Sequence, residues 1–127
     1  MGIVQPQRRI LRKICPQFRE MSPHGSENYC CGGGSGFAIM SATNFKDWRE
    51  NISSRMKLKQ ILDIFQDVLE PSVKKYVCAP CSNCKGAIRD LLKGNGLTEK
   101  YRIGYGGLVD LVVNAMVEVE RPFIEWE

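Results

Sequence analysis

Hydrophobic residues recur at helical spacing along the middle of the chain, between residues 44 and 69. Asn44 is a favoured N-cap residue, and Asp47 stands three positions after it, as in a capping box. Pro71 cannot continue a helix and marks its end. The pattern therefore predicts one long amphipathic helix whose apolar stripe faces the core. The stripe consists of Trp48, Ile52, Met56, Ile61, Phe65, Val68 and Leu69.

The N-terminal third of the chain combines a short basic helix with a polar loop. Residues 6–15 place Ile10, Leu11 and Ile14 at helical spacing and carry a proline at an early helical position. Residues 22–35 are rich in Ser, Gly, Pro and Asn, a composition that is typical of a loop.

The C-terminal half alternates between strand-like and helix-like segments. Residues 74–79 and 101–105 have the pattern of short strands. Between them, residues 82–92 predict a helix that Ser82 or Asn83 caps, and residues 108–117 are apolar on several faces and predict a buried helix. This alternation predicts an α/β fold, with a small parallel sheet flanked by helices.

Length and composition indicate a single folded domain over residues 1–127. Hydrophobic residues make up 43% and charged residues 25% of the chain, which excludes a disordered tail. A net charge of +4 is too small to indicate nucleic-acid binding. No apolar run approaches the about 20 residues of a membrane span, because Asp110 and Asn114 interrupt the best one. With no secretory signal at the start, we expect a cytoplasmic protein without direct membrane insertion.

Six cysteines are concentrated in the chain, and in a reducing compartment such clustering favours metal or redox chemistry over disulfides. Cys81 and Cys84 stand where a predicted strand runs into the start of a predicted helix. The positive end of the helix dipole stabilises thiolates, the form that binds metal or attacks disulfides. The alternative is a pair of small buried residues, because free cysteine is often found in a core.

A second group, Cys30 and Cys31, is followed directly by a glycine-rich stretch. Adjacent thiolates diverge, so they suit a cluster of several metal ions better than one ion. Glycines let the backbone approach closely and turn several N–H groups toward an anionic centre. The alternative is a flexible surface loop with incidental cysteines. The glycines concerned are Gly32, Gly33, Gly34 and Gly36.

Residues 28–40 (NYCCGGGSGFAIM) and 79–92 (APCSNCKGAIRDLL) resemble the CCG, or cysteine-rich, domain of heterodisulfide reductase subunits B and D. The resemblance extends over roughly residues 5 to 118. The family pattern has one cysteine, then a Cys-Cys pair followed by Gly, then Cys-x-x-Cys. The resemblance implies five thiolates that hold a non-cubane [4Fe–4S] cluster, which in the B and D subunits reduces a bound disulfide.

Carried onto this chain, the resemblance implies that Cys30, Cys31, Cys81 and Cys84 are cluster ligands. The first family ligand lies upstream of the basic helix, at a position this sequence does not reach, so the resemblance covers the C-terminal half of such a domain. It implies an iron–sulfur module for electron transfer or thiol–disulfide reduction. The module would work inside a larger complex with other redox subunits, and it would not be catalytic alone.

Two other readings of the four thiols stay open. A Cys₄ set also suits a structural zinc ion, although zinc ligands are usually spaced by two or more residues, unlike Cys30 and Cys31. A metal-free interaction domain is the third reading. Cys15 and Cys78 are outside the family pattern and are expected in the core, the alternative being that either substitutes for the fifth ligand. His24 is expected to be a solvated loop residue, the alternative being a ligand or proton donor.

The incomplete family pattern also has consequences for assembly and folding. Without the upstream segment, apolar surface near Ile10, Leu11 and Ile14 should lie uncovered, which predicts a homodimer or a partner-bound form. The apolar helices can form a core without cysteine ligation, so we also expect the chain to fold without metal.

Overall fold

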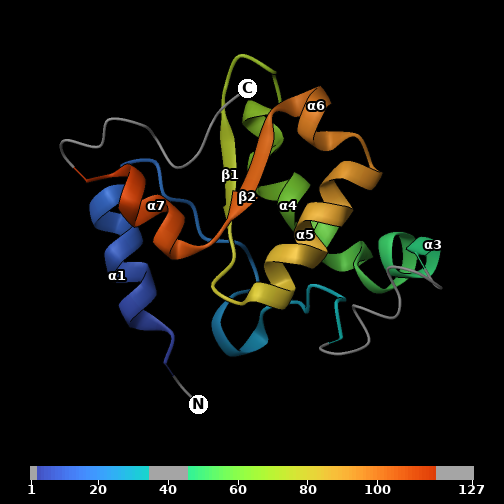
Figure 1. Cartoon of the computed structure of the whole chain (residues 1–127), viewed down its shortest axis with the longest axis horizontal. Coiled ribbons are helices and arrows are strands. Elements are labelled where there is room, and N and C mark those ends of the chain that lie inside the picture. The colour runs from blue at the N-terminus through green and yellow to red at the C-terminus, as the bar shows by residue number, and fades with distance from the viewer. Residues whose placement is uncertain (1–2, 35–45, 117–127) are drawn as a thin grey trace.

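The structure of the chain is a computed structural model, which describes residues 3–34 and 46–116. Within these residues helices lie on both sides of a small central sheet (Figure 1). No described helix is long and apolar enough to cross a membrane. The elements are α1 (Gln5–Ile14), η1 (Gly25–Glu27), α3 (Lys46–Trp48), η2 (Arg49–Ser53), α4 (Arg55–Phe65), η3 (Gln66–Val68), β1 (Lys75–Cys78), α5 (Ser82–Gly94), α6 (Leu97–Tyr101), β2 (Ile103–Gly106) and α7 (Leu108–Asn114).

The two strands pair in parallel, with Lys75 opposite Ile103 and Cys78 opposite Gly106. Helices α5 and α6 form the crossover connection that parallel pairing requires. This arrangement confirms the predicted α/β fold with its small parallel sheet. The short helix α6 was not predicted, and it moves the start of the second strand from residue 101 to residue 103.

The hydrophobic core lies on one face of the sheet, between the strands and helices α4, α5 and α6. Cys84 packs against the edge of this core, which apolar side chains otherwise form. The expectation that the chain folds without metal stays a prediction, which this apolar core supports. Its buried members are Ile61, Val77, Ala79, Ile88, Leu91, Leu92, Leu97 and Ile103.

The prediction of one continuous long helix is wrong. The backbone N–H of Ser54 donates to the carbonyl of Arg49, five residues earlier, over 3.1 Å, so a π-helical turn separates α3 from α4. Arg49 in this turn is buried, and so is Lys57, which lies four residues before the buried stripe residue Ile61 on the same face of α4. The proposed cap Asn44 lies outside the described residues. The stripe residues that are exposed instead are Trp48, Ile52 and Met56.

Helices α1 and α7 form a layer on the other side of the sheet, where they contact each other (Figure 1). The expectation of a buried C-terminal helix is wrong, because no residue of α7 is buried and Val109 is 70% exposed. An apolar helix at the margin of a small domain has too few neighbours to cover all its faces. The basic helix is confirmed as α1, on which Leu11 is buried and Ile10 is exposed.

The contrast between Ile61 and Ile52 gives a direct test of this core. Ile61 is fully buried, whereas Ile52 is 50% exposed, although both belong to the same apolar pattern. I61A should lower the free energy of unfolding of the metal-free protein by about 2–5 kcal/mol. I52A should change it by no more than about 0.5 kcal/mol. Urea unfolding measures both, and equal losses would mean that the helix keeps one uninterrupted face.

Candidate metal centre

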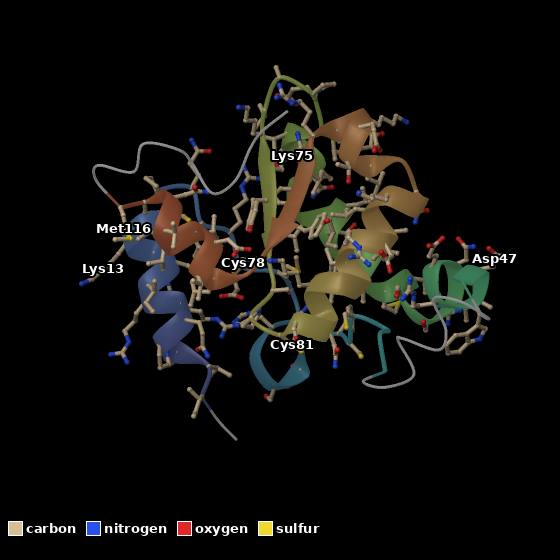
Figure 2. All side chains as sticks on the ribbon, viewed as in Figure 1. Lys13, Asp47, Lys75, Cys78, Cys81 and Met116 are labelled. Carbon is tan, nitrogen blue, oxygen red and sulfur yellow. The ribbon has the colours of Figure 1, made fainter. Side chains whose placement is uncertain are left out.

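The two cysteine groups meet at one end of the sheet. The loop of residues 30–34 follows η1 and passes the start of α5, where Figure 2 labels Cys81. The Cys84 side chain lies close enough to Cys31 and Cys81 to shift the pKa of both, and the Cys30 side chain likewise shifts the pKa of Cys31. All four side chains are free thiols. The structure therefore brings together all four cysteines that the sequence singled out.

The Cys31 and Cys84 thiols influence each other and differ in acidity. The hydrogen bond from Cys84, with further ones from the Gly33 backbone and the Cys30 side chain, lowers the pKa of the Cys31 thiol. The same contact with Cys31, reinforced by burial, raises the pKa of Cys84. The first proton therefore leaves the pair easily and the second is retained, as in other coupled acid pairs. A thiolate is thus available at this point of the site.

Cys81 is stabilised as a thiolate by the helix that it precedes. The backbone N–H groups of Cys84 and Asn83 point toward its sulfur and lower its pKa. Cys81 itself, and not Ser82 or Asn83, occupies the N-cap position of α5, with extended backbone angles. The effect expected at the start of a helix is therefore found for Cys81, whereas the same expectation is wrong for Cys84, whose pKa is raised by Cys31 and by burial.

The glycines after Cys31 shape the loop around the sulfurs. Gly32 donates its backbone N–H to the Cys30 sulfur over 3.3 Å and has a φ of +78°, a region that favours glycine. A Cβ at Gly32 would stand 2.5 Å from the Ser54 Oγ, so no larger residue fits there. Gly33 is buried and Gly34 also has a positive φ. Gly36 lies outside the described residues.

Two serines between η2 and α4 hold this loop in place. The Ser54 hydroxyl donates to the Cys31 carbonyl over 2.7 Å, and the Ser53 hydroxyl donates to the Gly32 carbonyl over 3.1 Å. Sequence reasoning missed both residues because it placed them inside a regular helix. A weak signal was present, since serine is an unfavourable residue in a helix interior and favours side-chain bonds to backbone groups.

Two further residues of α4 contact the segment before the cysteines. The Lys57 ammonium donates to the Asn28 Oδ1 over 2.9 Å and to the Gln60 side-chain oxygen. The Gln60 amide donates in turn to the Pro23 carbonyl over 2.6 Å. Lys57 is not part of the predicted apolar stripe, yet the structure buries it near the cysteines.

The chemistry of this donor set fits a metal–sulfur group. Two sulfurs are favoured as thiolates, backbone N–H groups point at three of the four sulfurs, and a buried cation stands near them. Sulfur ligands with such hydrogen bonds are the donors of iron–sulfur clusters. Within residues 3–34 and 46–116, no group of three or more His, Cys, Asp or Glu residues is already arranged so that it could hold a metal ion.

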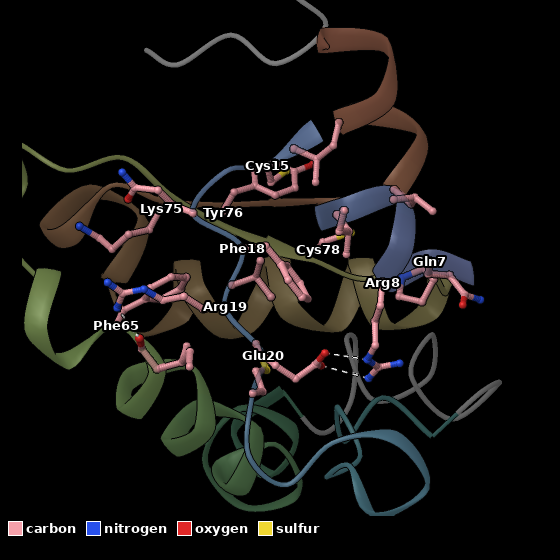
Figure 3. A pocket seen from close by; sticks show the side chains of 18 of the residues that line it. Gln7, Arg8, Cys15, Phe18, Arg19, Glu20, Phe65, Lys75, Tyr76 and Cys78 are labelled. Atoms are coloured by element: carbon pink, nitrogen blue, oxygen red, sulfur yellow. Dashed lines mark hydrogen bonds and ion pairs between the residues drawn. The ribbon is translucent and has the colours of Figure 1, made fainter. Parts of the chain in front are cut away.

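Cys15 and Cys78 lie on the wall of a separate cavity of about 700 Å³ between α1 and β1 (Figure 3). Both are half-buried, where a core position was expected. Burial raises the pKa of Cys78 to about 11 and also raises that of Cys15. Arg8 and Glu20 line the same cavity and form an ion pair over 2.6 Å. His24 is exposed, as expected.

Comparison with known proteins gives one match. A family model described as a cysteine-rich domain, CCG, matches residues 4–89, about two thirds of the chain. The matched stretch runs from α1 into α5 and contains all four clustered cysteines; it stops short of the expected residue 118. No curated protein and no solved structure matches the chain.

The close packing of Gly32 against the serines predicts a difference between two glycines. Gly32 and Gly25 both have positive φ, but a Cβ at Gly25 would meet nothing within 4 Å. G25A should lower the free energy of unfolding by about 1–2 kcal/mol through backbone strain alone. G32A should cost about 1–3 kcal/mol more, because its methyl group overpacks the serine contact. Urea unfolding compares them, and equal costs would contradict the close approach of the loop to α4.

Proposed function

Because the chain belongs to the CCG cysteine-rich domain family, which indicates an iron–sulfur or metal-binding redox-type module, we propose that it is a heterodisulfide reductase-like redox module. Its role would be electron transfer or thiol–disulfide reduction within a larger complex in the cytoplasm, where clustered thiols stay reduced. The observation that carries the proposal is the contact between Cys31 and Cys84, which joins the Cys-Cys-Gly loop to the Cys-x-x-Cys helix start.

The proposed ligands are Cys30, Cys31, Cys81 and Cys84, and the proposed group is a [4Fe–4S] cluster of the non-cubane type. When bound, such a cluster supplies one-electron transfer at a potential that hydrogen bonds to its sulfurs adjust. The chain contributes two sulfurs that lose their protons readily, and backbone N–H groups aimed at sulfur. Gly32 keeps the backbone close enough for its N–H to reach Cys30.

Reconstitution with iron and sulfide under exclusion of air tests the proposal. The wild-type chain should take up iron and acid-labile sulfide at about four of each per chain, with sulfur-to-iron absorption bands. C31S and C81S should lose most of this uptake. C78S is the matched control, because Cys78 stands three residues before Cys81 but faces the cavity beside α1.

The alternatives give different results in the same experiment. A structural zinc site would retain one zinc ion per chain and take up no labile sulfide. A metal-free interaction domain would bind neither. Equal uptake by C78S, C81S and the wild type would show that the clustered thiols are not the ligands.

We also propose that the layer formed by α1 and α7 contacts another subunit, either a second copy of the chain or another redox subunit. Three apolar side chains that lie just before α1, on α1 and on α7 are exposed, which favours an interface. Ile14, which the sequence analysis also expected at this surface, is half-buried. The exposed residues are Ile3, Ile10 and Val109.

Sedimentation velocity tests this surface at micromolar concentration. The wild type should sediment as a dimer, and the double variant I10E/V109E should sediment as a monomer, because two buried charges oppose association. M56E is the control, since Met56 is an exposed apolar residue of α4. A wild-type monomer would leave the α1 and α7 layer with no role in self-association.

A further inference from the structure

Lys57 is a buried cation that faces the cysteine cluster. Its side chain comes from the first turns of α4, and the residue is only 5% exposed. Burial lowers the pKa of Lys57, and electrostatic interaction with the Cys31, Cys84 and Cys30 thiol groups, when these are ionised, acts in the opposite direction. The ammonium group therefore stands within electrostatic reach of three of the four clustered cysteines.

The direct partners of this ammonium group are uncharged. Lys57 donates to the amide oxygens of Asn28 and Gln60, and no carboxylate of the described residues forms an ion pair with it. Removing an ammonium ion from water is costly unless an anion compensates for it, and neutral oxygens compensate only in part. The nearby groups that can carry the compensating negative charge are the cysteine sulfurs.

We propose that Lys57 is a charge-tuning residue of the metal centre, which supplies a fixed positive charge that balances the negative charge on its sulfurs. This inference rests on the proposed iron–sulfur function. Lys57 exchanges no proton or electron in this role. When the centre gains one electron its negative charge increases, and a fixed cation stabilises that reduced state. The presence of Lys57 therefore makes the reduction potential more positive.

A purely structural role for Lys57 predicts a different dependence on its hydrogen bonds. The bond to Asn28 links α4 to the segment two residues before Cys30, so Lys57 also helps to position the loop. N28A removes this bond but keeps the charge. If the charge of Lys57 matters, N28A should have the wild-type reduction potential, whereas the reduction potential of K57M should differ from it.

The first measurement is the reduction potential of the reconstituted protein. K57M should shift the potential to more negative values, and K57R should keep it close to the wild type. K59M is the matched control, because Lys59 is an exposed lysine of the same helix and pairs with Asp63. A wild-type potential in K57M, or an equal shift in N28A, would overturn the proposal.

The second measurement uses the metal-free protein and needs no cluster. Cys30 is exposed and therefore accessible to reagents, and it interacts electrostatically with Lys57. Its modification by an anionic and by a cationic disulfide reagent can be followed by mass spectrometry. Ellman's reagent and cystamine are suitable probes. The rate constant for anionic Ellman's reagent divided by that for cationic cystamine should fall about tenfold in K57M, because the charge that attracts the anion is lost. The same ratio should stay unchanged in K57R and K59M. An unchanged ratio in K57M would contradict the proposal.

The two measurements separate this inference from the function on which it rests. A wild-type chain that takes up no iron overturns the iron–sulfur function, while the rate ratio still decides whether Lys57 acts on the sulfurs by its charge. If K57M does not fold, K57Q replaces it, because its amide retains hydrogen-bond donors without the charge.

Discussion

The hydrogen bonds that the Ser53 and Ser54 hydroxyls donate to the Cys-Cys-Gly loop are the constraint on which the site depends. The loop has few contacts of its own that could fix it, because glycine contributes no side chain. The π-helical turn before α4 brings both serines to the loop carbonyls, and Gly32 permits the close approach. Turns of this kind are frequently found at functional sites, where they redirect side chains out of a regular helix.

The site lies where parallel-sheet proteins commonly bind their ligands, beyond the carboxyl end of a strand. Cys81 follows β1 after two residues and is the N-cap of α5, so strand, turn and helix together fix its sulfur. The core on which this arrangement rests consists of aliphatic side chains from α4, α5, α6 and the sheet. The residues that form the core are thus largely different from the cysteines of the site, and Cys84 is the cysteine of the site that packs against the core.

Two pairs of cysteines in this chain have environments with opposite effects on the pKa of the thiol. Cys31 and Cys81 receive hydrogen bonds that lower their pKa, whereas burial raises the pKa of Cys15 and Cys78. The first pair is therefore suited to metal binding or nucleophilic attack, and the second pair is kept protonated. Lys57 of α4 interacts electrostatically with the cysteines of the site, so its charge is part of the environment of Cys31.

The sequence by itself determined the elements that local chemistry specifies. Pro6 and the spacing of Ile10 and Ile14 predicted α1, the alternation after Pro71 predicted the parallel strands, and the two cysteine motifs predicted a shared site. These predictions succeeded because hydrophobic periodicity, proline and motif spacing act over a few residues. They led to the family that the later comparison confirmed.

Only the tertiary structure decided which side chains of the central helix are buried. Lys57 is buried on the same face of α4 as Ile61, four residues later, whereas Ile52, which belongs to the predicted stripe, is 50% exposed. The exposure of Val109 on α7 depends in the same way on how many neighbours the helix finds. Periodicity can show that a helix has an apolar face, but the direction of that face depends on contacts with residues distant in sequence, such as the one between Ser54 and Cys31.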